Sequence, residues 1–315
     1  MPVVMAHFIS TFRIIGKTAP SYLSVAILAL AGCSILTKSQ VAEVSKFAKA
    51  ANSYTALPGA VLKAEADMWE ARELLDVSIT TSDHGWDAIT RARSQSDRLY
   101  SDAERVDSAL GILKIYGEQL TLLVSDKPVT DLDKSAEDLG KSLDGAIALY
   151  NKSYGTTFSS IGGWAAAGIS AAGRLYIRHK QQVLLRQYVD QAQPMIEKLN
   201  KDTTRFTDVI IEQIKSQEED LHSSYKNVAD TFKGAGGIPV STVQSVRDAY
   251  REGQQALKLA PICKKAANDY SAAHAKLRQA ISEKRNLTGA IEEIEALEQE
   301  LEAANKVREN LSKKK

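Results

Sequence analysis

The chain has 315 residues, with 40 Lys and Arg against 39 Asp and Glu. This even balance argues against a nucleic-acid-binding protein, because such proteins usually carry a basic excess. The length suits one large domain or two small ones.

The N-terminal region has the order of charges and apolar residues that is typical of a secretory signal peptide. Two basic residues, Arg13 and Lys17, precede an apolar run from Tyr22 to Ala31, and no acidic residue occurs before Cys33. The run is too short for a transmembrane helix, which needs about twenty apolar residues. Because the basic region is long, translation could begin at either of two methionines, Met1 or Met5.

The apolar run ends in Leu30-Ala31-Gly32-Cys33, which resembles the lipobox of bacterial lipoproteins. In that family the cysteine is diacylated on sulfur, the chain is cut just before it, and the new amine is usually acylated. The resemblance implies that Cys33 is the lipidation site, that Leu30, Ala31 and Gly32 form the processing motif, and that residues 1–32 are removed. The alternative is a buried helix start with a chance cysteine.

The residue after Cys33 bears on the membrane that would hold the anchor. It is Ser34, whereas in lipoproteins of Gram-negative bacteria an aspartate there tends to retain the protein at the inner membrane. The resemblance therefore implies a palmitate-type anchor in the cell outer membrane, with the protein facing the periplasm. Stable anchoring takes at least two acyl chains, which a triacylated cysteine would exceed.

The remaining chain reads as all-α, since it is rich in helix-forming residues and shows no sustained period-two alternation. We expect an elongated antiparallel helical bundle with coiled-coil-like packing over residues 39–315, joined to the anchor by a short linker, 33–38. One stripe follows alternating steps of three and four: Ile89, Ala92, Ser96, Leu99, Ala103, Val106, Leu110, Leu113, Gly117, Leu120 and Val124. This 3.5-residue period predicts long helices packed side by side.

Proline and glycine mark the expected interruptions of the helices. Leu57-Pro58-Gly59 should break or kink one helix, and Pro194 should kink or divide the long helix expected after Ile177. Residues 234–239 form the clearest loop in the chain. An apolar stripe then runs from Ala266 to Leu311 between glutamate-rich faces.

One uncharged segment leaves two interpretations open. Small residues at Gly163, Ala167 and Ala171 recur every four positions, as they do where helix backbones approach closely. They could form a tight crossing inside a soluble bundle, or the segment Phe158–Ile177 could insert into a membrane, as apolar hairpins of pore-forming helical toxins do. The uncharged stretch of about fifteen residues is short of a full span, which favours packing.

Searches for catalytic, metal and cofactor sites find none. The five histidines, His7, His84, His179, His222 and His274, share no helical turn. Asp83-His84-Gly85-Trp86-Asp87 suits a helix N-terminus better than a weak metal site. Cys263 suits a small buried residue, with an intermolecular disulfide or a reactive thiol next to Lys264 and Lys265 as the alternative.

The sequence therefore favours a non-enzymatic, lipid-anchored scaffold or protein-interaction lipoprotein of the cell envelope, with an unknown protein partner and no cofactor. The alternative is a membrane-active, pore-forming-like helical protein that uses residues 158–177.

Overall fold

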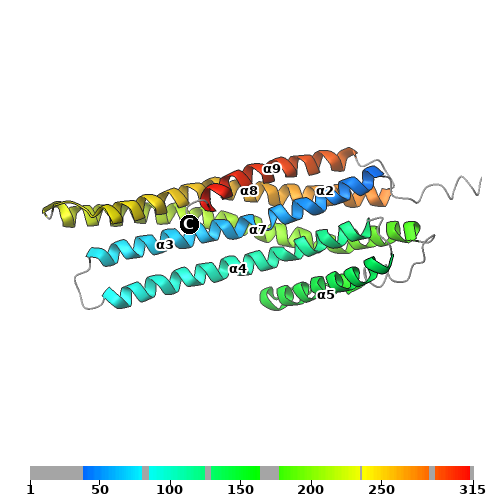
Figure 1. Ribbon diagram of the computed structural model, residues 1–315, viewed down its shortest axis with the longest axis horizontal. Helices are drawn as coiled ribbons and strands as arrows, with labels where there is room; N and C mark the ends of the chain where they lie inside the picture. Colours follow the sequence, from blue (N-terminus) through cyan, green and yellow to red (C-terminus); the bar gives the residue numbers. More distant parts are fainter. Residues whose placement is uncertain are drawn as a thin grey trace, which may run out of the picture. The chain divides into compact units, whose positions relative to one another are not determined.

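The computed structural model describes residues 38–79, 85–124, 129–163, 177–234, 236–283 and 288–312. These residues are 94% helical, they form no strand, and their helices pack against one another in a bundle. The all-α antiparallel bundle predicted from the sequence is therefore confirmed (Figure 1).

The structure describes seven helices and one short 3₁₀ turn. They are α2 (Lys38–Tyr54), α3 (Leu57–Ile79), α4 (Gly85–Leu123), α5 (Val129–Tyr154), α7 (Ile177–Thr231), α8 (Val240–Glu283) and α9 (Thr288–Ser312), with the 3₁₀ turn η1 (Phe232–Gly234) after α7. Helix α7 alone has 55 residues, a length of about 80 Å. Residues 36–315 form one compact unit, and both apolar core clusters lie inside it.

Side-chain pairs between helices define the direction of each helix. Tyr54 bonds to Asn200 and Arg72 bonds to Asp220, so α2 and α3 run parallel to α7. The pairs Lys63–Asp107 and Tyr100–Asp67 join α3 to an antiparallel α4. The pairs Lys264–Asp208 and Gln254–Glu218 likewise make α8 antiparallel to α7. Helix α9 packs on α8 and α2, and α5 packs on α4.

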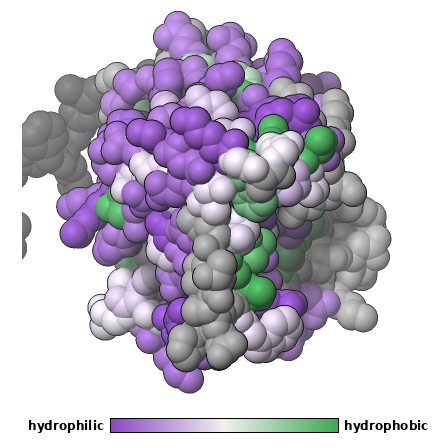
Figure 2. Space-filling view, turned by 90° about the vertical axis from the view of Figure 1, so that its left-hand side faces the viewer, coloured by the Kyte–Doolittle hydropathy of each residue, from purple (hydrophilic) through white to green (hydrophobic). Residues whose placement is uncertain are grey.

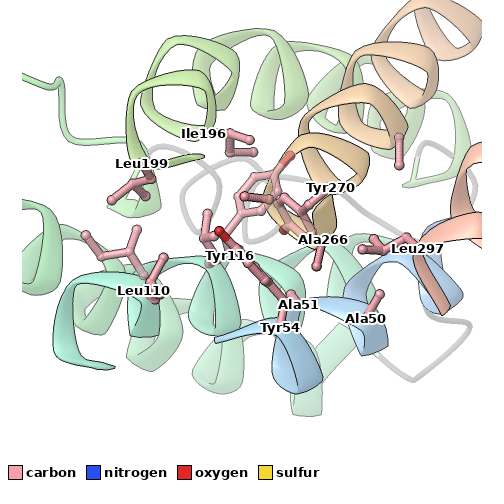
Figure 3. Packing of buried hydrophobic residues seen from close by; sticks show 14 of the residues in the cluster. Ala50, Ala51, Tyr54, Leu110, Tyr116, Ile196, Leu199, Ala266, Tyr270 and Leu297 are labelled. Carbon is pink, nitrogen blue, oxygen red and sulfur yellow. The ribbon is translucent and has the colours of Figure 1, made fainter. Parts of the chain in front are cut away.

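The predicted stripe on α4 is buried or half-buried along its whole length, which confirms it as a packing seam. The seam is deepest in the second half of the helix, where Leu110, Leu113 and Leu120 are at most 2% exposed. Tyr116 and Ile112 are buried beside it, because α4 has neighbours on several sides there. Figure 3 shows Leu110 and Tyr116 among side chains of the other helices.

Small residues allow the closest helix contacts. A Cβ added at Gly117 on α4 would lie 2.8 Å from the backbone oxygen of Ala48 on α2. A Cβ at Gly253 on α8 would overlap the side chain of Met68 on α3. Backbone contact therefore requires glycine at position 117, whereas at Gly253 the flexible Met68 side chain would have to move.

The prolines interrupt the helices less than the sequence predicted. The break near Pro58 is present, since α2 ends at Tyr54 and Pro58 lies in the first turn of α3, where a missing N–H costs nothing. Of the two outcomes expected at Pro194, a kink or a division, the division does not occur, because α7 continues through it, as α8 continues through Pro261. Both prolines lie on exposed positions, where water can satisfy the freed carbonyl.

The seam on α4 predicts a strong asymmetry between two leucine variants. Leu110→Asp buries an unpaired carboxylate at a position 2% exposed and should lower the free energy of unfolding by more than about 3 kcal/mol. The control Leu149→Asp changes a leucine of α5 that is 68% exposed and should have an effect within about 0.5 kcal/mol. Urea unfolding of the 36–315 fragment, followed by circular dichroism, measures both. Equal stability of the two variants would show that this seam is not core.

Candidate functional site

The largest concentration of buried polar chemistry lies in the middle of the core, where aromatic rings of four helices meet. We call this cluster the tyrosine–histidine layer; it comprises Phe47, Tyr54, Tyr116, Tyr188, Tyr270 and His274, all 0% exposed. Phe47 and Tyr54 come from α2, Tyr116 from α4, Tyr188 from α7, and the remaining two from α8. Figure 3 shows Tyr54, Tyr116 and Tyr270 side by side, beneath Ile196 and Leu199.

Ring contacts hold the layer together. The ring centroids of Phe47 and Tyr270 lie 4.7 Å apart, and those of Tyr116 and Tyr188 lie 5.0 Å apart. The His274 ring lies 5.6 Å from both Phe47 and Tyr116. These separations are those of offset or tilted aromatic pairs, which contribute about 0.5–1.5 kcal/mol each beyond the burial of their area.

A chain of hydrogen bonds runs outward from the layer to the surface. The Tyr116 hydroxyl lies 2.7 Å from His274 Nε2, and His274 Nδ1 lies 2.6 Å from Gln193 Oε1. Gln193 Nε2 in turn donates to the carboxylate of Glu197 at 2.6 Å. A carboxylate can only accept, so its position orients the Gln193 amide with the oxygen toward His274. Nδ1 then carries the imidazole proton, and Tyr116 donates to Nε2.

His274 is held as a neutral ring. Burial, with a smaller contribution from the charge of Arg278, lowers its pKa from 6.5 to about 3. No bulk water reaches the ring, since the residue is 0% exposed. Its two nitrogens are already occupied by Tyr116 and Gln193. The arrangement therefore makes His274 a structural link between α4, α7 and α8 rather than a base that could meet a substrate.

A second chain of hydrogen bonds ties the segment after α5 to the layer. The Tyr188 hydroxyl donates to Gln119 Oε1, and Gln119 Nε2 donates to the carbonyl of Gly162 at 3.4 Å. The backbone amides of Gly162 and Gly163 both donate to the Asp144 carboxylate at 2.7 Å. Burial raises the pKa of Tyr188 well above its ordinary value, so the phenol keeps its proton.

The far side of the layer holds the remaining cysteine. Cys263 is 0% exposed, and burial raises the pKa of its thiol to about 12. A protonated, inaccessible thiol is neither nucleophilic nor free to form an intermolecular disulfide. The prediction that Cys263 is a small buried core residue is confirmed, and the reactive-thiol alternative is wrong.

Two buried glutamates, Glu43 on α2 and Glu65 on α3, lie outside the layer, and burial perturbs the pKa of Glu65. Glu65 on α3 is 3% exposed, and its Oε2 atom has no hydrogen-bond partner among the described residues. Burial raises its pKa from 4.5 to about 7. Two nitrogen atoms further along α3 are also buried without a hydrogen-bond partner among the described residues: Trp69 Nε1 and Arg72 Nε. The Arg72 guanidinium lies over the Trp69 ring, 4.3 Å from its centroid.

Several residues predicted from the sequence lie outside the described part of the chain. These are the lipobox residues Leu30, Ala31, Gly32 and Cys33, together with Asp83 and His84. Among the described residues, no group of three or more His, Cys, Asp or Glu side chains could hold a metal ion.

The uncharged segment is described only in part. Ile161 is 2% exposed and Phe158 packs against the core. A Cβ at Gly162 would overlap the backbone of Gly140 on α5. Phe158, Ile161 and Gly162 therefore pack within the bundle, whereas Gly163 is exposed, and residues 164–176, with Ala167 and Ala171, lie outside the described part of the chain. None of the described helices is apolar over a long enough stretch to cross a bilayer.

No protein-family model, curated protein or solved structure matches the chain.

Only weak signals in the sequence point to the tyrosine–histidine layer. His274 lies one turn from Tyr270 and Leu277 on the apolar face of α8, which is the pattern of a satisfied core histidine. Its partners Tyr116 and Gln193 are 158 and 81 residues away along the chain. Contacts over such separations have no local pattern, so only the folded bundle reveals them.

Glu65 predicts a specific dependence of stability on pH. The raised folded-state pKa means that the folded chain holds this proton more tightly, so stability falls as pH rises from about 4.5 to about 7. Glu65→Gln should remove that fall and stabilise the 36–315 fragment at pH 8 by roughly 1–3 kcal/mol. The control Glu212→Gln, at a side chain 73% exposed, should leave both stability and its pH profile unchanged. Urea unfolding at pH 5 and pH 8 tests this; parallel profiles for wild type and Glu65→Gln would contradict it.

Proposed function

We propose that this chain is a lipoprotein of the bacterial cell envelope, anchored through Cys33, whose helical bundle is a non-enzymatic scaffold or interaction module. The observation that carries the proposal is Leu30-Ala31-Gly32-Cys33 behind a basic region and a short apolar run. The absence of aspartate after Cys33 supports a position in the outer membrane, facing the periplasm.

The bundle is suited to such an attachment. Residues 36–315 form a compact unit that includes the whole described core. Helix α2 begins at Lys38, and the five residues from Cys33 to Thr37 would span at most about 18 Å. A lipid on Cys33 would therefore keep the N-terminal end of α2 close to the membrane surface.

The charge of the processed chain also fits a protein-binding role. Residues 1–32 contain two basic residues and no acidic one, which leaves 38 basic and 39 acidic residues. A nearly neutral chain gains little electrostatic binding free energy from anionic lipid surfaces or nucleic acid. The acyl chains would therefore supply the membrane affinity. The core also supports a non-enzymatic role, because both ring nitrogens of His274 are hydrogen-bonded within the bundle, to Tyr116 and Gln193.

The proposal predicts that Cys33 alone takes up lipid. Metabolic labelling with an alkynyl fatty acid in a Gram-negative host should label the wild-type chain, whereas Cys33→Ser should be unlabelled and should keep residues 1–32. Cys263→Ser is the matched control and should be labelled like wild type, since Cys263 is buried in the folded bundle. Undiminished labelling of Cys33→Ser would refute the anchor.

A further inference from the structure

The apolar core of the bundle is divided into two clusters. The larger one, which we call the main core, draws buried side chains from all seven described helices. The smaller one lies at the end of the bundle where η1 follows α7, and we call it the distal cluster (Figure 1). Its buried members are Leu75 of α3, Leu221 and Val228 of α7, and Ala249 of α8.

One level of the bundle separates the two clusters. On each of three helices, seven residues lie between the nearest buried members of the two clusters, counted from one to the other: Met68 and Leu75 on α3, Ile214 and Leu221 on α7, and Ala256 and Ala249 on α8. These three intervals lie side by side, because Arg72 bonds to Asp220 and Gln254 bonds to Glu218 across them. We call this level the polar belt.

Polar groups and a glycine occupy the belt in place of apolar side chains. Its buried position on α7 is Gln217, 7% exposed, and its buried position on α8 is Gly253. Three buried polar atoms of the belt have no hydrogen-bond partner among the described residues: Trp69 Nε1, Arg72 Nε and Gln217 Oε1. Each of them would gain a hydrogen bond to water if the belt opened. The belt therefore opposes closure of the bundle, whereas the two apolar clusters favour it.

The distal cluster is small and incompletely covered. Val240, Val243 and Tyr250 of α8 are 71%, 39% and 48% exposed. A groove of about 820 Å³ opens between α7 and α8 there. Figure 2 views this end and shows hydrophobic surface among hydrophilic side chains. Because helical segments without tertiary packing are marginally stable in water, the helices beyond the belt depend on this small cluster.

We propose that the end of the bundle beyond the polar belt unfolds locally as one unit while the main core stays folded. The unit comprises residues 72–79 of α3, 221–231 of α7 and 240–249 of α8, together with η1. Its opening exposes Leu75, Leu221 and Val228, an apolar surface that the closed bundle hides. The proposal does not depend on the lipid anchor.

Hydrogen–deuterium exchange of the full chain, followed by mass spectrometry of peptic peptides, tests the proposal. Peptides from 221–231 and 240–249 should have protection factors at least about a hundredfold lower than main-core peptides from 185–199 and 263–277. Their exchange should also accelerate less steeply between 0 and about 2 M urea, because local opening exposes less surface than global unfolding. Equal protection and equal urea dependence of all four peptides would overturn the proposal.

A matched pair of valine variants separates local opening from global unfolding. Val189 in the main core and Val228 in the distal cluster both lie on α7 and are 0% exposed. Val189→Ala should lower protection of the main-core peptides at least about tenfold and leave the distal peptides unchanged, since local opening keeps Val189 buried. Val228→Ala should lower protection of both sets, because Val228 becomes exposed in both processes. An equal loss of protection in the distal peptides of Val189→Ala would contradict a separate unit.

A leucine variant tests the polar belt as the boundary. Gln217→Leu replaces an amide whose oxygen has no partner among the described residues by an apolar side chain. It should raise protection of the distal peptides about tenfold by joining the two clusters. The control Gln213→Leu, at an exposed position one turn earlier on α7, should leave protection unchanged. Equal protection of the distal peptides in the two leucine variants would overturn the role of the belt.

Discussion

A neutral imidazole in the core constrains how the long helices can pack. Tyr116, His274 and Gln193 come from α4, α8 and α7, and each satisfies a polar group of the next. A shift of one helix by a single turn would leave several of these groups buried and unpaired, at about 1–3 kcal/mol each. The rest of the interface is largely Ala, Leu, Ile and Val, which tolerate such shifts far better. The tyrosine–histidine layer therefore fixes the register that the apolar seams leave open.

That register determines what the two ends of the bundle present. Helix α2 begins at one end, and the connection between α7 and α8 lies at the other (Figure 1). The proposed attachment through Cys33 would hold the first end at the membrane and leave the connection between α7 and α8 at the far end. The hydrogen bonds of the core thereby set the spacing between the two ends, along helices of up to 55 residues.

The sequence predicted the helices and their apolar faces well, because helix periodicity is a local property. The stripe from Ile89 to Val124 and the break before Pro58 are present in the bundle. The sequence left open whether Pro194 kinks or divides its helix, and the helix is not divided there; whether a proline divides a helix depends on whether water reaches the freed carbonyl, which the sequence does not reveal. The tyrosine–histidine layer could not be predicted because its bonds join residues far apart in the chain. The lipid-anchor residues stay a prediction from resemblance.

The protonation of His274 tests the account most directly. Long-range ¹H–¹⁵N correlation spectra of the 36–315 fragment, assigned with His274→Gln, identify which ring nitrogen carries the proton. The account predicts a neutral ring at pH 5, with hydrogen on Nδ1 and a bare Nε2 that accepts from Tyr116, because the pKa is lowered to about 3. An imidazolium at pH 5, or a proton on Nε2, would contradict both the hydrogen-bond chain and its role in fixing the register.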